Sequence, residues 1–184
     1  MDRPARWLIP EVDSDRAGRL AASLGISPVA ARVLAVRGYD DPDAAWRFLN
    51  PSLDDLHDPY LMLGMSAAVE RLRSAIEKRE KILLYGDYDA DGTISVVILK
   101  KAIELAGGAA DHHIPNRLRD GYGVHPEVIE AAAAAGTKLI VSVDTGIRAA
   151  EAVCRARSLG IDVIVTDHHL PGDSLPDADC IVNP

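Results

Sequence analysis

Three short apolar segments of this chain are each followed at once by acidic or histidine residues. Residues 82–85 precede Gly-Asp-Tyr-Asp-Ala-Asp-Gly at 86–92, Leu139–Val143 precedes Asp144, and residues 163–166 precede Asp-His-His at 167–169. Short aliphatic runs of this length predict buried strands. Because parallel strands end at one edge of a sheet, the pattern favours a fold that gathers these polar groups at that edge.

Helical patterns separate the predicted strands. The sequence predicts helices over 65–78, 93–106, 126–135 and 149–159, and strands over 81–85, 112–115, Leu139–Val143 and 163–166. Gly107, Gly136 and Gly160 follow three of these helices, as expected where a left-handed residue ends a helix. The alternation predicts an α/β fold, with a parallel sheet flanked by helices on both faces.

Residues 1–60 lack this alternation. They show helical patterns at 16–24, Pro28–Val36 and 43–49, and no cluster of chemically active groups. We therefore expect a small helical segment, with a capping or docking role, before an α/β domain at 61–184.

Composition limits the cellular setting. The chain has no run of 18 apolar residues and no signal-peptide pattern at its N-terminus, so no membrane span is expected. Cys154 and Cys180 lie among apolar residues at no metal-like spacing, which predicts buried free thiols in a reducing cytoplasm. The net charge of −8 disfavours nucleic acid as a partner, but the carboxylates of a metal site remain negative only until cations bind.

The acidic loop carries Asp87, Asp89 and Asp91 at alternating positions. Three carboxylates this close repel one another unless something positive offsets them, and oxygen-rich clusters suit Mg²⁺ and Mn²⁺. The alternative is an ordinary Asp/Gly-rich turn. A calcium-binding EF-hand is excluded because the required glutamate position is occupied by Ile98. We expect Thr93 or Ser95 to cap the following helix.

The other two strand ends carry complementary groups. Asp144 is placed to bridge two cations, although a helix N-cap is the alternative. An aspartic-protease role for Asp-Thr-Gly is disfavoured because those enzymes are all-β proteins. One of His168 and His169 would ligate a metal while the other faces a phosphate, with Asp167 orienting a ring. The alternative is a pair of surface histidines.

A polar loop at 115–123 contains groups suited to a phosphate. Arg117 and Arg119 are able to clamp a phosphate by paired hydrogen bonds, and Tyr122 is a candidate stacking platform or loop anchor. An ordinary polar loop is the alternative. His112 and His113 lack neighbouring carboxylates other than Asp111, and we interpret them as structural or surface residues.

Together these motifs resemble the DHH phosphoesterase superfamily, named after the triplet at 167–169. The segments GDYDADG, IPNRLRDGYG, VSVDTGI, VTDHH and IVNP, with FLNPSLDDLHDPYLMLGM before them, are similar to its bacterial exonucleases that act only on single-stranded DNA. The resemblance covers nearly the whole chain, and the combination of motifs is far more specific than any one of them.

The resemblance implies a cytoplasmic 5′→3′ exonuclease that degrades single-stranded DNA to mononucleotides in recombination and repair, with replication or repair proteins as partners. It also implies two Mn²⁺ or Mg²⁺ ions, which would lower the pKa of a bound water and stabilise both oxygens of an in-line displacement. The implied metal ligands are Asp89, Asp91, Asp144 and His168, with Asp87 either as a further ligand or as a support for the ligands. His169 would face the scissile phosphate. Beyond the resemblance, we expect Asn116, Arg117 and Tyr122 to contact substrate, with Arg117 as a phosphate clamp.

The chain departs from the superfamily pattern at its C-terminal end. The superfamily's fourth aspartate motif is not found before Pro184, so we expect a truncated phosphoesterase domain with incomplete coordination and weak activity. Another DHH phosphodiesterase, acting on oligoribonucleotides or cyclic dinucleotides, is one alternative function. A manganese pyrophosphatase is disfavoured because Tyr85 stands where a histidine is expected. A non-catalytic DHH-like binding module is the other alternative.

Overall fold

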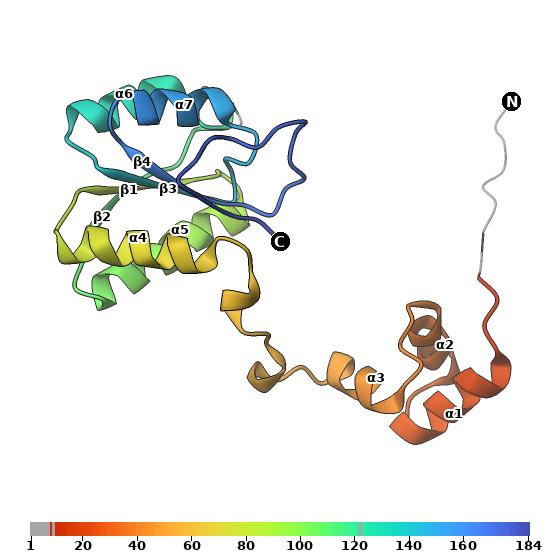
Figure 1. The fold of residues 1–184 in the computed structure, drawn as a ribbon. Helices are drawn as coiled ribbons and strands as arrows, with labels where there is room; N and C mark the ends of the chain where they lie inside the picture. Colours follow the sequence, from red (N-terminus) through yellow and green to blue (C-terminus); the bar gives the residue numbers. More distant parts are fainter. Residues whose placement is uncertain (1–7, 9, 122) are drawn as a thin grey trace, which may run out of the picture. The chain divides into compact units, whose positions relative to one another are not determined.

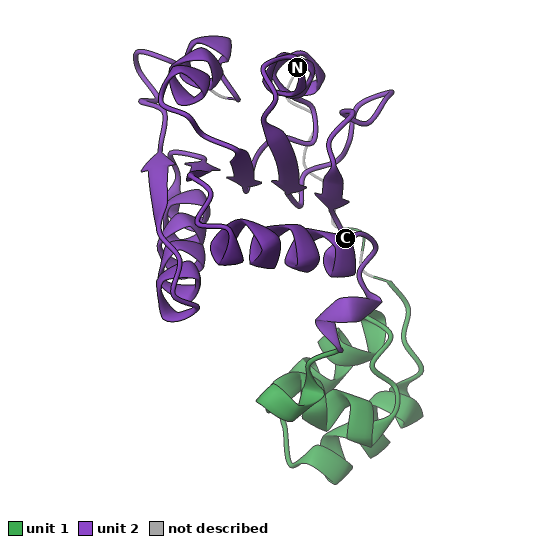
Figure 2. Cartoon of the chain, turned by 60° about the vertical axis from the view of Figure 1, so that its left-hand side comes forward, with its two compact units in different colours: residues 1–57 green, residues 58–184 purple. Residues whose placement is uncertain are grey.

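The computed structural model describes residues 8, 10–121 and 123–184 (Figure 1). Within it the chain divides into two compact units, residues 1–57 and residues 58–184, coloured separately in Figure 2. Each unit is built around apolar residues of its own, so each is described by itself.

The first unit is helical. Its elements are α1 (Ser14–Leu24), α2 (Pro28–Val36), α3 (Pro42–Leu49) and the 3₁₀ turn η1 (Leu53–Asp55). The side chains of Asp13, Ser27 and Asp41 cap the N-termini of α1, α2 and α3 in turn. In each cap a side-chain oxygen accepts hydrogen bonds from backbone N–H groups of the first helical turn. The buried core of the unit consists of Leu20, Ala31, Leu34 and Ala45.

The second unit contains a sheet of five parallel strands in the order β2-β1-β3-β4-β5. The strands are β1 (Ile82–Gly86), β2 (Ala110–His113), β3 (Leu139–Val143), β4 (Asp162–Thr166) and β5 (Cys180–Val182). The chain first moves outward from β1 to β2 and then crosses back to β3, so the direction of winding reverses between β1 and β3.

Helices cover both faces of this sheet. The elements α4 (Met65–Glu77) and α5 (Ala90–Leu105) lie on one face, α6 (Pro126–Ala134) and α7 (Ala150–Ser158) lie on the other, and η2 (Pro59–Leu61) precedes α4 (Figure 1). Alternate residues of each strand feed two separate cores: Leu84 faces the first, while Leu83 and Tyr85 face the second. This double burial explains the continuous apolar runs in the sequence, and it confirms the predicted α/β class.

Several predicted elements differ in detail. Helix α5 begins at Ala90 rather than residue 93, because Asp89 caps it with a side-chain oxygen that accepts a hydrogen bond from the N–H of Gly92. The prediction that Thr93 or Ser95 would cap this helix is therefore wrong. Strand β5 was absent from the predicted elements, since it has three residues and receives its register from β4.

The two cysteines occupy different environments. Cys180 is buried in β5, as predicted, but Cys154 is exposed on α7, so the prediction of two buried thiols is half wrong. The periodicity of α7 turns its buried face, with Ala152, Val153 and Ala156, toward the sheet and leaves position 154 outward.

No single helix among the described residues is long and apolar enough to cross a bilayer. Helices α1 and α2 meet the length and composition criteria only as a pair, and they are bent by 117° where they join.

Candidate metal centre

The strand ends beside the winding reversal are level with one another. In the sheet register Gly86 pairs with Val143, and Val143 pairs with Thr166. The residues that immediately follow these level ends are Asp87, Asp144 and Asp167, which are 4%, 8% and 7% exposed. In open α/β sheets the crevice at such a reversal is the place where ligands bind. The backbone therefore brings three buried aspartates to the position where a site is expected.

The loop after β1 supplies a first group of ligand atoms. Oxygens of Asp87, Asp89 and Asp144 all lie within 4.8 Å of one another. Asp87 also accepts a hydrogen bond from the N–H of Tyr88 at 2.8 Å. The loop folds tightly because Gly92 lies against Asp87, where an added Cβ would approach the Asp87 backbone oxygen to 2.7 Å. A side chain at position 92 would therefore displace the acidic loop.

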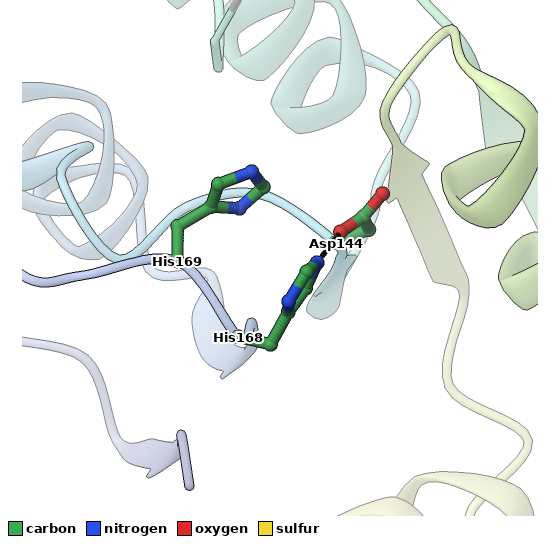
Figure 3. A group of neighbouring side chains, drawn as sticks. All are labelled: Asp144, His168 and His169. Atoms are coloured by element: carbon green, nitrogen blue, oxygen red, sulfur yellow. Dashed lines mark ion pairs between the residues drawn. The ribbon is translucent and has the colours of Figure 1, made fainter. Parts of the chain in front are cut away.

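The loop after β4 supplies a second group. Atoms of Asp144, His168 and His169 also lie within 4.8 Å of one another, and Figure 3 shows the ring of His168 directed at the Asp144 carboxylate. The Nε2 of His168 lies 2.9 Å from Oδ1 of Asp144 and 3.8 Å from Oδ2 of Asp91. Asp144 therefore belongs to both groups.

Asp144 is held in an unusual state. Its φ of 60° lies in the left-handed region, where strained residues are often functional. Both carboxylate oxygens are buried, and neither accepts a hydrogen bond of sound geometry among the described residues, although His168 lies 2.9 Å from Oδ1. Burial, then repulsion from Asp91 and Asp89, raises the pKa of its carboxyl above the ordinary value.

Asp167, unlike Asp144, is surrounded by hydrogen-bond donors. Its oxygens accept hydrogen bonds from the backbone N–H groups of Ile147, His168 and His169 at 3.0, 2.8 and 3.1 Å, and lie 2.7 Å from Nδ1 of His169. Burial raises its pKa, but these hydrogen bonds outweigh burial and leave the pKa below the ordinary value. The prediction that Asp167 orients a histidine ring is confirmed.

Burial and hydrogen bonds also shift the pKa values of Asp87, Asp89 and His169. Burial raises the pKa of Asp87, with a further contribution from Asp89. The hydrogen bond from Gly92 lowers the pKa of Asp89. The hydrogen bond to Asp167 raises the pKa of His169. Burial therefore disfavours the charged forms of two carboxylates, Asp87 and Asp144, and a bound cation would stabilise those charged forms.

These residues fit a divalent cation. A buried carboxylate whose oxygens accept no hydrogen bond is costly, and such groups are usually explained by a missing ion, water or ligand. Carboxylate oxygens with an imidazole nitrogen are suitable ligands for Mn²⁺ and Mg²⁺. Asp144 supplies the unsatisfied oxygens, and Asp87, Asp89 and His168 lie close enough to complete a shell.

Asn183 is a site residue that its local sequence does not reveal. Its side-chain amide donates to the backbone oxygens of Asp167 and His169 at 2.9 and 3.1 Å. It follows strand β5 directly, so it ties the histidine loop to the neighbouring strand. Only the pairing of β5 with β4 reveals where Asn183, in the segment IVNP, lies.

The loop after β2 places its two arginines differently. Arg119 forms an ion pair with Asp120, with Nε 2.6 Å from Oδ1. The guanidinium of Arg117 lies over the ring of Tyr88, 5.3 Å from its centroid, and Tyr88 stands inside the acidic loop. Of the two arginines, Arg117 is therefore the one that contacts the acidic loop, through Tyr88.

The structure gives no contact between the other predicted substrate-binding residues that it describes and the candidate metal centre. The Oδ1 of Asn116 accepts hydrogen bonds from the N–H groups of Leu118 and Arg119, which shape the loop. Its contact with substrate stays a prediction, and Tyr122 lies outside the described residues. His113 packs against the ring of Tyr85, with centroids 5.1 Å apart, and takes no part in either group of ligand atoms.

Comparison with known proteins gives consistent results. The single-stranded-DNA-specific exonuclease RecJ of Bacillus subtilis is 41% identical over 179 residues, which cover 97% of this chain and 23% of that protein. RecJ of Escherichia coli is 44% identical over 161 residues, covering 86% of this chain and 27% of that protein. The chain thus spans about a quarter of the length of these relatives.

Solved structures agree on the fold. A crystal structure of RecJ from Thermus thermophilus in complex with Mn²⁺ matches 92% of this chain and 23% of that one, with a TM-score of 0.73 and 28% identity. A crystal structure of exonuclease RecJ bound to manganese matches 67% of this chain and 31% of that one, with a TM-score of 0.63 and 34% identity. The model of the DHH family, N-terminal domain, matches residues 81–184. The chain therefore belongs to the DHH family.

Proposed function

We propose that this chain carries the metal centre of a two-metal phosphodiesterase that removes mononucleotides from the 5′ end of single-stranded DNA, in recombination and repair. The observation that carries the proposal is Asp144, whose buried oxygens accept no hydrogen bond from the described residues and which lies in both groups of ligand atoms. The similar exonucleases RecJ, named for single-stranded DNA and crystallised with manganese, support the substrate and the cation.

The ligands divide between the two groups around Asp144. Asp87 and Asp89 form one group with Asp144, and His168 and His169 form the other, with Asp91 3.8 Å from Nε2 of His168. Two divalent ions bound there would lower the pKa of an attacking water and offset the charge that develops on the phosphate oxygens. The shared position of Asp144 would set the separation of the ions, so this residue has the largest expected effect on binding.

His169 is proposed to contact the scissile phosphate. Asp167 holds its ring through Nδ1 at 2.7 Å, and Asn183 holds its backbone carbonyl at 3.1 Å. A residue held both at its ring and at its backbone loses little freedom when a phosphate oxygen approaches. Asp167 therefore sets the orientation of the His169 ring.

Arg117 is proposed to hold a second phosphate group of the strand. Its guanidinium lies over Tyr88, within the loop that carries Asp87 and Asp89. Guanidinium groups bind phosphates through paired hydrogen bonds. Arg119, neutralised by Asp120, is less available for this role.

The first test is Mn²⁺ binding measured by calorimetry on this chain. We expect binding that is lost in Asp144→Ala and retained in Asp173→Ala, a control carboxylate exposed in the loop after His169. Release of labelled mononucleotide from 5′-labelled single-stranded DNA should then require Mn²⁺ and Asp144. Binding that is equal in both variants would overturn the metal-centre assignment.

Substrate class is tested in the same assay. Hydrolysis of a cyclic dinucleotide or a short oligoribonucleotide in preference to single-stranded DNA would replace the proposed exonuclease by another DHH phosphodiesterase. Mn²⁺ binding without hydrolysis of any of the three would indicate a binding module instead.

Location and protein partners form the weaker part of the proposal. Cys154 and Cys180 are free, as is usual in a reducing cytoplasm, and we propose that compartment. Replication or repair proteins are proposed as partners from the family resemblance alone, and co-purification with a tagged chain tests this.

A further inference from the structure

The connection between β2 and α6 carries Arg117 on a turn with its own internal bonds. Among the described residues, the hydrogen bonds of residues 116–120 are formed with one another, mainly through the side chains of Asn116 and Asp120. The turn therefore has a fixed internal shape, but its place in the molecule depends on how the two ends of the connection are held.

Tyr85 of β1 contacts both ends of this connection. Its ring packs against His113, the last residue of β2, with centroids 5.1 Å apart. Its hydroxyl donates to the carbonyl of Gly123 at 3.0 Å and accepts from the N–H of His125 at 3.2 Å. One side chain therefore holds together the two points from which the turn with Arg117 projects.

Tyr85 is itself held firmly. It is fully buried in the core that α6 and α7 cover, and in the sheet register it pairs with His113 of β2 and Ser142 of β3. Burial raises the pKa of its hydroxyl to about 12, so near neutral pH the hydroxyl keeps the proton that it donates to Gly123. The anchor is therefore a rigid group with its donor and acceptor both in use.

The far end of the connection needs such an anchor. Gly121 and Gly123 have φ values of 81° and 105°, in a region that glycine enters freely, and glycine loses more backbone freedom on folding than any other residue. Among the described residues, the hydrogen bonds that tie this end of the connection to the sheet are the two with Tyr85. Without them, the segment before α6 would have more conformations available to it, and the turn would move with it.

We propose that Tyr85 is a positioning residue for Arg117: its hydroxyl sets where the guanidinium lies over Tyr88, 5.3 Å from the ring centroid, and so where a phosphate is held. This inference rests on the proposed function, because phosphate binding by Arg117 is part of that proposal. Tyr85 belongs to neither group of ligand atoms, so it acts through Arg117 and not through the cations.

The test removes the hydroxyl alone in Tyr85→Phe, which keeps the ring and its packing. The probe is a single-stranded oligodeoxynucleotide with phosphorothioate linkages, which slow hydrolysis, titrated into the Mn²⁺-loaded chain by calorimetry. We expect its affinity to fall at least about fivefold while the affinity for Mn²⁺ changes less than about twofold. In an Arg117→Ala background the same substitution should have no further effect, because the group that Tyr85 positions is absent.

Two matched variants control for a loss of hydroxyl and for a loss of core packing. Tyr60→Phe removes the hydroxyl of an exposed tyrosine, and Ile161→Val removes one methylene from the core that contains Tyr85. Both should leave the oligonucleotide affinity unchanged. An equal fall in affinity in Tyr85→Phe with and without the Arg117 side chain would overturn the inference, since it would show that the hydroxyl acts independently of Arg117.

A second measurement follows Arg117 without any nucleic acid. Protons of a guanidinium above an aromatic ring have magnetic resonance signals displaced by the ring current. The Arg117 signals should therefore move in Tyr85→Phe and stay in place in both control variants, and unmoved signals in Tyr85→Phe would also overturn the inference. If these signals move but the unaltered chain binds no oligonucleotide, the proposed function fails while Tyr85 is still shown to position Arg117.

Discussion

Asp144 and Asp167 occupy equivalent positions after neighbouring strands, but their carboxylates are surrounded by different groups. Asp144 follows β3 and Asp167 follows β4, at level positions of the sheet. Both are buried, at 8% and 7% exposure. Their sequence settings are also alike, because each directly follows a strand of five residues.

Their surroundings differ in the donors that reach them. Asp167 accepts three backbone hydrogen bonds and lies 2.7 Å from a histidine nitrogen, so its pKa is lowered despite burial. The oxygens of Asp144 accept none from the part of the chain that the structure describes, and burial raises its pKa. The folded chain thus surrounds the charge of Asp167 with backbone donors, whereas the charge of Asp144 has, among the described residues, only the exposed ring of His168 beside it, 2.9 Å from Oδ1, and gains more from a cation. Substitutions at each aspartate test whether this difference is real.

The largest expected effect is on Mn²⁺ binding by Asp144→Asn. Asparagine tolerates the left-handed backbone at this position, where φ is 60°, but it removes the charge shared by both ligand groups. We expect affinity to fall by at least about a hundredfold, or 2.8 kcal/mol, measured by calorimetry. In EDTA the variant should be as stable as the unaltered chain or more so, because it removes a buried charge that is repelled by Asp91 and Asp89.

Asp173→Asn is the control for this measurement, because Asp173 is exposed in the loop after His169. It should leave both affinity and thermal stability unchanged. A fall in the stability of Asp144→Asn in EDTA would mean that the chain itself already satisfies this carboxylate.

The next effect is a loss of stability in Asp167→Asn. An amide can replace only one of two accepting oxygens, so at least one buried N–H or the His169 ring loses its partner. Such a loss costs about 1–3 kcal/mol, which chemical denaturation in EDTA would measure. A stability change equal to that of Asp144→Asn would remove the distinction between the two residues.

The pH dependence of these variants sharpens the comparison. The raised pKa of Asp144 means that the folded chain gains stability as the pH falls through that pKa, and loses it as the pH rises. The lowered pKa of Asp167 means that its contribution is present above the ordinary value of 3.8 and is lost as the pH falls below it.

Thermal unfolding in EDTA should therefore show two opposite trends, measured as differences from the unaltered chain. Any advantage of Asp144→Asn should shrink as the pH approaches 3.8 from neutrality. The deficit of Asp167→Asn should persist down to that pH and shrink only below it. Parallel curves for the two variants would contradict the assigned directions.

Sequence alone predicts the parts of this molecule that depend on local pattern. The strands β1, β3 and β4 are continuous apolar runs, and the polar residues after them converge because parallel strands end together. The sequence does not show that Asp89 caps α5, since Thr93 and Ser95 are equally good capping residues by type. Three-residue β5 carries too little pattern to be recognised.

The different roles of Asp144 and Asp167 also lie beyond local pattern. Each is an aspartate directly after a strand, and the donor that distinguishes Asp167 most clearly, the N–H of Ile147, is twenty residues away. The sequence predicted an orienting role for Asp167 from its histidine neighbours. Its full set of backbone donors appears only when the loops after β3 and β4 pack together.

The smallest expected effect concerns Asn183, which holds the loop that carries Asp167 and His169. Asn183→Ala removes two hydrogen bonds, to the carbonyls of Asp167 and His169. Because Asn183 is only partly buried, water can replace part of this loss, and we expect destabilisation of about 1 kcal/mol. Mn²⁺ affinity should change less than threefold, about 0.65 kcal/mol, because the atoms around Asp144 are untouched. A larger fall in affinity than in stability would show that the histidine loop, and not Asp144, limits metal binding.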